Sequence, residues 1–576
     1  MLYKYTKVQG KNLKNITSNF IDTNFKYLCI SKESTVLQAM KCIEHGREKL
    51  CFIVDKNSCL LRVISDGDIR RSLLKGRKLT DKVKNIHNRK PIVGKLNNLK
   101  DAFSLLTISI TVIPIIDHDF RLIGVIRQRD VISNTNIRNK SIAVFGLGYV
   151  GLTLGLILAE NGFSVLGVDK DKQYTKKLAN KEKPFYENGL DNLMNKHIGN
   201  NLKIATSIKK YYVDIYIITV GTPINKKTSK PNISYIKTAL EKVAKTLKNG
   251  DLVILRSTVP IGCTRNDVIP CLERNSNLKA GLNFSIAFCP ERTSEGQALR
   301  ELKELPQIVG GFDDRSRELA IRLFNEITHT VVDVASLEAA EMCKLLDNTF
   351  RDTVFAYSNQ MATLAETIGL NLHELITKVN LGYKRNSIPY PSPGVGGPCL
   401  SKDPYILINN FKSLGLNSSI IESARHINEQ APALIFNKCK KILKSFKKNI
   451  KNEKIFILGL AFKGYPETSD TRGSTTIWLI DYLKIKGIKK LFVHDPIIDS
   501  KEIQNMNLNY SDINKGFKDS SLVLIMNNHP SYSNLNLNLL LKTMNTPAVF
   551  YDGWNIFSAK HFDNFPNIHF TGTGTG

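Results

Sequence analysis

The sequence predicts an α/β protein in which two parallel-sheet domains are joined by a long central helix and preceded by a smaller repeated module. Three observations predict this: a strand, glycine loop and helix beginning at Ser141, a second strand series beginning at Ile455, and an internal repeat before residue 138. The 576 residues are 42% hydrophobic, which is enough for several packed cores. We place the domains at 1–25 (polar leader), 26–138 (repeated module), 139–335 (first α/β domain), 336–445 (central helical domain) and 446–576 (second α/β domain).

The formal net charge is +29, from 81 Lys and Arg against 52 Asp and Glu. The basic residues are spread along the chain without an Arg-rich block, so we interpret them as a solvated surface that favours a polyanionic substrate. A nucleic-acid binder is a weaker alternative. The ten cysteines show no CxxC pair and no metal-ligand spacing, and the N-terminus lacks the apolar core of a signal peptide. We therefore expect free thiols, no metal, a cytoplasmic location, and neither nucleic acid nor membrane as a partner.

The first module contains an internal repeat. Phe52–Asp55 followed by Val63–Ile69 matches Ile113–Asp117 followed by Val125–Val131, with a constant offset of 62 residues. Each copy predicts a strand, a turn, a second strand and a helix. The repeat resembles a pair of cystathionine-β-synthase-type (CBS) domains, and this resemblance implies an adenine nucleotide bound between the two halves.

The resemblance implies that the regulatory nucleotide is held by Ser65, Asp68 and Asp130. Both halves depart from the family pattern: Arg62 stands at the usual glycine of the first half, and Arg127 stands at the usual hydroxyl of the second. These two arginines could instead bind phosphates. We give equal weight to nucleotide sensing and to a purely structural dimerisation role.

A dinucleotide fingerprint begins the first α/β domain. The apolar strand Ser141–Phe145 leads into Gly146-Leu147-Gly148-Tyr149-Val150-Gly151 and an apolar helix, and the next strand stops at Asp169. In a Rossmann fold the first glycine makes the turn, the second admits the pyrophosphate and the third packs helix on strand. Asp169 would accept from the ribose hydroxyls, which favours NAD over NADP. A membrane span over Ser141–Ala159 explains none of these glycines.

Three later strands end in small polar or acidic residues, at Gly221-Thr222-Pro223, Ser257-Thr258-Val259-Pro260 and Cys289-Pro290-Glu291-Arg292. Open α/β sheets bind ligands at these carboxyl ends. A helical stretch from Ser336 to Leu370 then carries Lys344 and Asn348 four residues apart. The pair could donate to a developing oxyanion, or could simply face solvent.

The segment Gly394-Val395-Gly396-Gly397-Pro398-Cys399-Leu400-Ser401-Lys402-Asp403 is the strongest candidate for chemistry. Its glycines let backbone approach a ligand, and the four-residue spacing puts Cys399 and Asp403 on one face of a helical turn. Lys402 could favour the thiolate and Asp403 could act as a base. We favour a nucleophilic Cys399 over a buried, inert one.

The second α/β domain places Lys463 and Arg472 just beyond a strand, where cations suit a phosphate. The tail Thr571–Gly576 alternates Thr and Gly, and we expect it to be mobile.

In this order, the motifs resemble the UDP-glucose/GDP-mannose dehydrogenase family over roughly residues 139–576. The resemblance implies NAD-dependent four-electron oxidation of C6 of a UDP-sugar to the uronic acid, for surface polysaccharide precursors, by a homo-oligomer that is at least a dimer. Cys289–Gly296 and Phe462–Pro466 look like the N-acetylhexosamine branch, so UDP-N-acetylmannosamine is our first candidate and UDP-glucose the alternative. The alternative of another class is a nucleotide-sensing protein with a degenerate enzyme body.

The resemblance also implies residue roles. Cys399 would be the nucleophile, passing through a thiohemiacetal and a thioester, with Lys344, Asn348, Asp403 and Glu291 completing the catalytic set. The implied NAD contacts are Gly146, Gly148, Val150, Gly151, Asp169, Thr222, Thr258, Glu295 and Lys402. The implied substrate contacts are Ile388, Ser392, Gly396, Lys463 and Arg472.

Overall fold

The computed structural model describes residues 21–575, except 24, 47, 87–90, 96–101, 103–104, 106–109, 128–136, 209–210 and 226–227. Asp130, a predicted nucleotide contact, lies outside the described residues. Contacts divide the chain into two units, Met1–Asn139 and Lys140–Gly576. Of the helices within the described ranges, none combines the length and the apolar character needed to cross a bilayer.

The N-terminal unit contains two three-stranded sheets built on the same hairpin. One sheet has the order β1 (Cys29–Ser31), β2 (Leu50–Val54), β3 (Leu60–Ser65), and the other has the order β4 (Gly94–Lys95), β5 (Val112–Ile116), β6 (Leu122–Arg127). In both hairpin turns one aspartate, Asp55 or Asp117, accepts from the backbone N–H groups two and four residues later. The helices α3 (Val36–Gly46) and α4 (Asp66–Leu74) contact the first sheet. The sequence repeat is therefore a repeat of structure.

Two residues that were assigned to the leader pack onto the second sheet. The backbone of Asp22 exchanges hydrogen bonds with Val125 of β6, at 2.9 and 3.0 Å. A Cβ on Gly124 would lie 2.2 Å from the Ile21 side chain, so this glycine makes room for the incoming chain. The second half is consequently covered by the chain's own N-terminal residues.

The arginines that could have bound phosphates are both engaged within the protein. Arg127 is buried and donates to Glu48 at 2.6 Å, to the Tyr27 hydroxyl at 2.8 Å and to the Asp22 carboxylate. Arg62 donates to the backbone carbonyls of Lys84 and Ile86. For Arg127 the phosphate-binding alternative is wrong, because two carboxylates already neutralise a guanidinium that has left solvent.

The second unit begins with an eight-stranded sheet, the first lobe. Its order is β14 (Val331–Ser336), β13 (Gln307–Gly311), β12 (Ser285–Phe288), β11 (Leu252–Leu255), β10 (Ile215–Ile218), β7 (Ser141–Phe145), β8 (Ser164–Val168), β9 (Leu202–Ala205). β7 to β12 are parallel in the doubly wound dinucleotide-binding order, and β13 joins β12 antiparallel. The helices are α7 (Tyr149–Glu160), α8 (Lys172–Ala179), α9 (Leu190–His197), α10 (Ser234–Ala244), α11 (Ile269–Ser276), α12 (Ala298–Glu304) and α13 (Asp314–Asn325).

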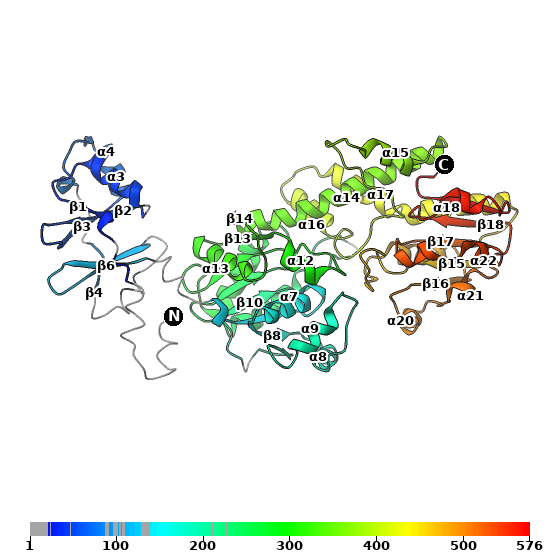
Figure 1. Cartoon of the computed structure of the whole chain (residues 1–576), viewed down its shortest axis with the longest axis horizontal. Coiled ribbons are helices and arrows are strands. Elements are labelled where there is room, and N and C mark those ends of the chain that lie inside the picture. Colours follow the sequence, from blue (N-terminus) through cyan, green and yellow to red (C-terminus); the bar gives the residue numbers. More distant parts are fainter. Residues whose placement is uncertain are drawn as a thin grey trace. The chain divides into compact units, whose positions relative to one another are not determined.

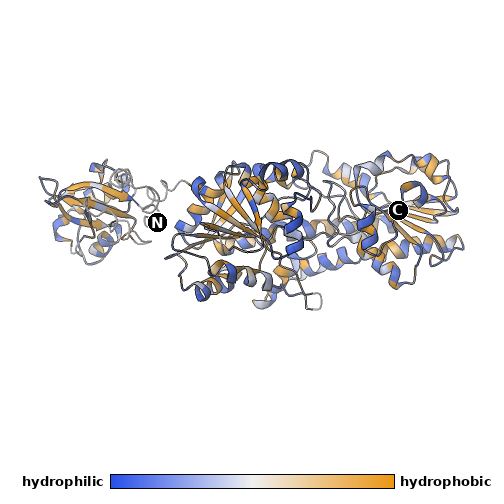
Figure 2. Ribbon diagram, turned by 90° about the horizontal axis from the view of Figure 1, so that it is seen from below, coloured by the Kyte–Doolittle hydropathy of each residue, from blue (hydrophilic) through white to orange (hydrophobic). Residues whose placement is uncertain are grey.

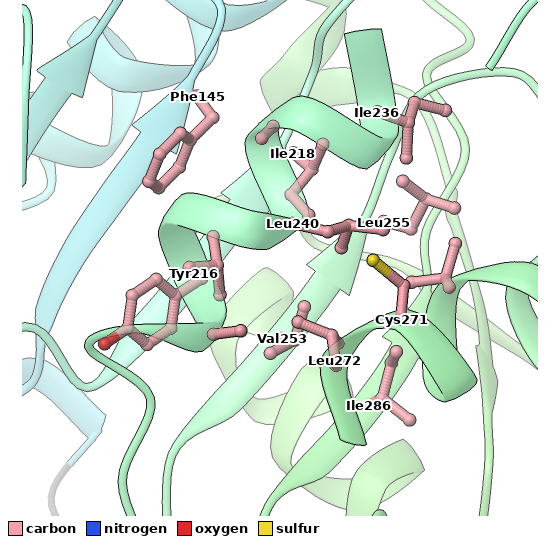
Figure 3. Packing of buried hydrophobic residues seen from close by; sticks show 14 of the residues in the cluster. Phe145, Tyr216, Ile218, Ile236, Leu240, Val253, Leu255, Cys271, Leu272 and Ile286 are labelled. Carbon is pink, nitrogen blue, oxygen red and sulfur yellow. The ribbon is translucent and has the colours of Figure 1, made fainter. Parts of the chain in front are cut away.

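The core of the first lobe lies where strand residues of one face meet α10 and α11. Tyr216 and Ile218 of β10 and Val253 of β11 pack against Leu240 and Leu272, all at most 1% exposed (Figure 3). The alternate residues of these strands are also buried, because the sheet has helices on both faces. Figure 2 shows the apolar strands inside polar-faced helices in both lobes.

The second lobe is a five-stranded parallel sheet in the order β16 (Leu491–His494), β15 (Ile455–Leu458), β17 (Leu522–Ile525), β18 (Ala548–Asp552), β19 (Ile568–Gly572). Its helices are α18 (Ala431–Ser445), α19 (Thr475–Ile485), α20 (Ser500–Asn505), α21 (Ile513–Phe517) and α22 (Leu537–Leu541). The tail expected to be mobile is instead held: Gly572 ends β19, Gly574 N–H donates to Glu366, and Lys438 donates to the Gly572 carbonyl.

The helix α14 (Leu337–Thr367) runs between the two lobes (Figure 1). Ser336 caps its first turn, and it packs against α15 (Leu372–Asn380), α16 (Asp403–Ser413) and α17 (Ser419–Glu429). It ends three residues before the predicted Leu370. The two α/β sheets, the long central helix and the N-terminal module confirm the predicted fold class.

Candidate functional site

The glycine loop of the first lobe leaves room for a phosphate at the start of α7. Gly146 has φ +89°, and a Cβ on Gly151 would lie 1.8 Å from the Gly146 carbonyl, so only glycine allows this packing. A Cβ on Gly148 would meet nothing within 4 Å. Gly148 is exposed and precedes the free N–H groups of the helix. This open N-terminus fits the pyrophosphate of a dinucleotide such as NAD.

The polar groups predicted to contact NAD gather at the carboxyl edge of the same sheet. The Asp169 carboxylate follows β8 and accepts from the Leu147 N–H of the glycine loop at 2.9 Å. Thr222 and Thr258 follow β10 and β11, and the Thr222 hydroxyl donates to the Thr258 carbonyl at 2.6 Å. Val150 lies in the first turn of α7. The structure therefore brings these residues to the crevice where open α/β sheets bind ligands.

Cys399, Asp403 and Asn348 come together at the start of α16. The Asp403 N–H donates to the Cys399 carbonyl at 2.8 Å, which is the predicted helical turn. The Asp403 carboxylate is fully buried and accepts from Asn348 of α14 at 2.5 Å and from Lys402. Cys399 is the one residue among the ten cysteines that is exposed as a whole, although surrounding protein atoms crowd its thiol.

The charges around Cys399 set its reactivity. Crowding by surrounding protein atoms raises the pKa of the thiol, and the positive charges of Lys344 and then Lys402 oppose that rise. Asp403 and Glu295 add to it. Because the thiolate is the nucleophile, Lys344 is the side chain that does most to make Cys399 reactive near neutral pH.

Lys344 is buried on α14 and donates to the backbone carbonyl of Glu291. The Glu291 carboxylate points elsewhere: one oxygen accepts from Arg256, at 2.6 and 3.1 Å, and the other from the N–H groups of Arg292 and Thr293. Burial alone would raise the pKa of Glu291, but Arg256 and these hydrogen bonds lower it below its usual value. The Glu291 carboxylate is therefore engaged by donors of the protein itself, and its place in the catalytic set stays a prediction.

Arg256 was missed as a site residue because in the sequence it only terminates a strand. It is 2% exposed and also donates to the Cys289 carbonyl and to Gln307. An arginine that ends a buried apolar strand must find acceptors. An arginine at the end of an apolar strand therefore indicates a buried network of acceptors, and this feature of the sequence could have identified Arg256.

A second missed residue, Arg425 of α17, holds the Cys399 loop. It is 1% exposed, forms an ion pair with Asp352 of α14 at 2.6 Å, and donates to the carbonyls of Leu400 at 3.0 Å and Val395 at 3.5 Å. The available signal was the spacing of Lys344, Asn348 and Asp352, which repeat every four residues on one helical face.

Glu341 extends the same face of α14 by one turn. Its carboxylate accepts from the Gly262 N–H at 2.6 Å and from the Thr264 N–H and hydroxyl at 2.8 and 2.6 Å. Burial raises its pKa to about 7, against the hydrogen bonds from Thr264 and Gly262. The loop it holds follows Thr258, so α14 also fixes an edge of the cofactor crevice.

The two basic residues of the second lobe that are predicted to contact the substrate both contact the first lobe. Lys463 donates to the Ser294 hydroxyl and the Glu295 carbonyl, both at 2.7 Å. Arg472 pairs with Asp470 at 2.6 Å and with the Glu295 carboxylate at 3.3 Å. Burial, then the charge of Asp470, raises the pKa of Glu295 to about 8, and Arg472 opposes this. The lobes therefore meet beside the loop that carries Glu295.

The glycines around Cys399 have mainly packing roles. A Cβ on Gly396 would lie 2.1 Å from the Gly473 carbonyl, and one on Gly397 would lie 2.7 Å from the Phe462 ring. Ser392 is buried, and its hydroxyl donates to the Gly394 carbonyl of the same loop. The Ile388 N–H donates to Asn380 of α15. These glycines permit the loop to approach the second lobe, whereas the sequence suggested approach to a ligand alone.

Three family descriptions match consecutive parts of the second unit. They are the NAD binding domain (140–328), the central domain (338–430) and the UDP binding domain (456–559) of the UDP-glucose/GDP-mannose dehydrogenase family. A CBS domain matches residues 83–135.

Several relatives are similar over most of their length. The chain is 32% identical to a UDP-N-acetyl-D-mannosamine dehydrogenase of Pyrococcus horikoshii, over 72% of this chain and 95% of the relative. A solved structure of a UDP-D-ManNAc dehydrogenase from that organism has a TM-score of 0.69 at 30% identity, covering 76% of this chain and 99% of its own. The chain is 29% identical to an NDP-N-acetyl-D-galactosaminuronic acid dehydrogenase of Ralstonia solanacearum, over 73% of this chain and 97% of the relative.

We predict that Lys344→Met slows alkylation of Cys399 by iodoacetamide at neutral pH. Removing the largest influence that lowers the Cys399 pKa leaves less thiolate. In the unmodified chain the rate should rise about tenfold per pH unit until the raised pKa is reached, because only the thiolate reacts. Mass spectrometry of the Cys399 peptide measures the rate.

The matched control for this measurement is Lys303→Met, which removes an exposed lysine of α12. Its alkylation rate should equal that of the unmodified chain. An unchanged or faster rate in Lys344→Met would show that Lys344 does not favour the thiolate.

Proposed function

Because the chain belongs to the UDP-glucose/GDP-mannose dehydrogenase family, we propose that it is the NAD-dependent enzyme that oxidises C6 of UDP-N-acetylmannosamine to the uronic acid. The observation that carries the proposal is the cluster of Cys399, Asp403, Asn348 and Lys344 beside the first lobe, which carries the glycine loop Gly146–Gly151. A degenerate enzyme body is the poorer alternative, since every member of this cluster is present and connected.

The residues assigned to NAD come mainly from the first lobe, and the basic residues assigned to the sugar nucleotide come from the second. NAD, when bound, supplies the hydride acceptor for both oxidations. Gly148 leaves space for its pyrophosphate, and Asp169 presents a carboxylate to its ribose. Lys463 and Arg472 present positive charge to a UDP-sugar diphosphate. Lys402 pairs with Asp403 and would contact the cofactor only from that position.

The four-electron oxidation needs a covalent step, because the aldehyde must stay bound between the two oxidations. The Cys399 thiolate adds to the C6 aldehyde and forms a thiohemiacetal, whose oxyanion can accept hydrogen bonds from Lys344 and Asn348. Oxidation of the thiohemiacetal gives a thioester on Cys399. A water deprotonated by Asp403 hydrolyses it, releasing the carboxylate and the Cys399 thiol.

The sugar is the finer part of the proposal. Relatives named for UDP-N-acetyl-D-mannosamine support the N-acetylhexosamine class, and the relative named for galactosaminuronic acid supports the same class with another sugar. UDP-glucose is the alternative substrate. All ten cysteines are free thiols, which fits the cytoplasm as the place of action.

We predict two NADH formed for each UDP-N-acetylmannosamine consumed, with higher kcat/KM than for UDP-glucose. NADH absorbance and chromatography of the product measure both quantities. Cys399→Ala should form no uronic acid while still binding NAD, whereas Cys59→Ala, in the N-terminal unit, should match the unmodified chain. Uronic acid from Cys399→Ala would refute the nucleophile, and a preference for UDP-glucose would refute only the sugar.

A homo-oligomer is the second finer proposal, and the exposed face of α14 supports it. Large apolar side chains are exposed along this helix and at its C-cap: Leu346, Phe350, Tyr357, Leu364 and the C-cap residue Ile368 are 50 to 68% exposed. Apolar rows of this extent on one helix are typical of a subunit interface. A second copy of the chain would cover them.

We predict that Phe350→Asp shifts the protein from dimer or higher oligomer to monomer in sedimentation equilibrium, because a charge at the most exposed residue of the row opposes burial. Leu282→Asp is the matched control, since Leu282 is equally exposed, at 69%, on a loop of the first lobe. A Phe350→Asp variant with unchanged mass would place the interface elsewhere.

For the N-terminal unit we propose one adenine nucleotide per chain, at the first half. Ser65 and Asp68 lie together at the start of α4, where the Ser65 hydroxyl donates to Asp68 at 2.7 Å. The second half is covered by Ile21 and Asp22, as described above. A ligand here can alter activity only through different affinity for two states of the enzyme.

Calorimetric titration of the full chain with AMP, ADP and ATP should show one site per chain, lost in Asp68→Asn. Asp66→Asn is the matched control, because Asp66 lies in the same helical turn and is half-buried like Asp68. Absence of binding by all three nucleotides, with unchanged kinetics in a chain beginning at Lys140, would leave the unit as an oligomerisation element.

A further inference from the structure

Exposed lysines line the amino edge of the second lobe's sheet. In a parallel sheet the segments that enter the strands share one edge, opposite the carboxyl edge that carries Lys463 and Arg472. For β15, β16, β17 and β18 these entering segments are 446–454, 486–490, 518–521 and 542–547. The segment that enters β19 carries the exposed Asp563. The exposed lysines of the first four segments, here called the lysine edge, are Lys447, Lys451, Lys486, Lys489, Lys490, Lys518 and Lys542.

Hydrogen bonds between them show that the four segments adjoin one another. Lys454 donates to the carbonyls of Lys515 and Lys518 at 2.7 and 2.6 Å, and Lys448 donates to Ser521 and to the Asn545 carbonyl. The Ile455 N–H donates to the Lys490 carbonyl at 2.9 Å. A Cβ on Gly487 would lie 4.0 Å from the Lys451 Nζ. The lysine edge is therefore one surface.

The charge of this surface is nearly unopposed. The same four segments contain only two acids, Glu453, which is engaged by Ser521, and Asp519. At the amino edge of the first lobe, Lys140 pairs with Asp214 and Lys279 with Glu273, while Lys245 and Lys248 are exposed.

The side chains favour a membrane over a nucleic acid. The four segments contain no arginine, the residue that suits bidentate contact with nucleic-acid phosphates and bases. Lysine is a hydrated point charge that attracts a negative surface without specific geometry. Ile485, beside Lys486, is 81% exposed at the end of α19, and an apolar side chain among lysines can enter the headgroup region.

We propose that the lysine edge docks the enzyme on an anionic lipid surface. The docking is electrostatic, with Ile485 adding an apolar contact. It concerns a surface on the opposite edge of the sheet from the catalytic cluster and does not depend on which sugar is oxidised.

The test is co-sedimentation of the full chain with vesicles of equal parts phosphatidylglycerol and phosphatidylcholine, and with phosphatidylcholine vesicles alone. We expect binding to the first only, lost at high salt. The combined variant Lys451→Glu, Lys486→Glu and Lys490→Glu should bind these vesicles at least about a hundredfold more weakly. The reason is that each lysine near an anionic surface makes a similar contribution to the binding free energy, and three of them are reversed. Ile485→Ser should weaken vesicle binding a few-fold, because it removes one apolar side chain from the headgroup region.

The matched control reverses three exposed lysines of the first lobe, Lys245→Glu, Lys248→Glu and Lys303→Glu. It should bind vesicles within about threefold of the unmodified chain, because these lysines lie outside the edge. NADH production by both triple variants shows that they are folded. Equal loss of binding in the control triple, no binding to phosphatidylglycerol vesicles, or retention on duplex DNA in place of vesicles would overturn the proposal.

Discussion

The site depends on one buried polar face of α14. Glu341, Lys344, Asn348 and Asp352 lie within about 16 Å along the helix axis, at 1.5 Å per residue. Each is at most 7% exposed, and each holds a different loop: the one after β11, the one after β12, the start of α16, and through Arg425 the Cys399 loop. Because a helix is rigid over three turns, the loops of the first lobe and the Cys399 loop keep a fixed spacing.

Burying these charged side chains lowers the stability of the fold, and the ion pair between Asp352 and Arg425 offsets part of this cost. Burial raises the pKa of Asp352, which Arg425 and Asn428 oppose. Among the described residues, Arg425 Nε and Asp352 Oδ2 still lack a hydrogen-bond partner. A buried ion pair gives little net stability, while removing one partner costs about 3–5 kcal/mol because the other charge stays buried. The pair therefore acts chiefly by fixing the geometry of the loop around Cys399.

The parts of the fold that the sequence predicted are those written in short, local patterns. Gly146 to Gly151 and the Cys399 to Asp403 turn lie within a few residues, so spacing alone predicted their shape. Arg256 and Glu291 are 35 residues apart, and Asp352 and Arg425 are 73 apart. Nothing in a single sequence says which of 81 basic residues meets which of 52 acidic ones. The prediction that the C-terminal tail is mobile was wrong for the same reason, because the residues that hold the tail, Glu366 and Lys438, are distant from it in the sequence.

The two edges of the second lobe's sheet suit two different kinds of anion. Lys463 and Arg472 follow β15 and meet partly buried partners on the first lobe, so each has a fixed direction suited to one diphosphate. The lysine edge precedes the same strand, about 13 Å away across four residues at 3.3 Å each. Its ammonium groups are exposed, which suits a diffuse surface whose attraction falls off within about 8 Å at physiological salt. Sheet polarity thus lets one lobe bind a small anion at one edge and face an extended one at the other without competition between them.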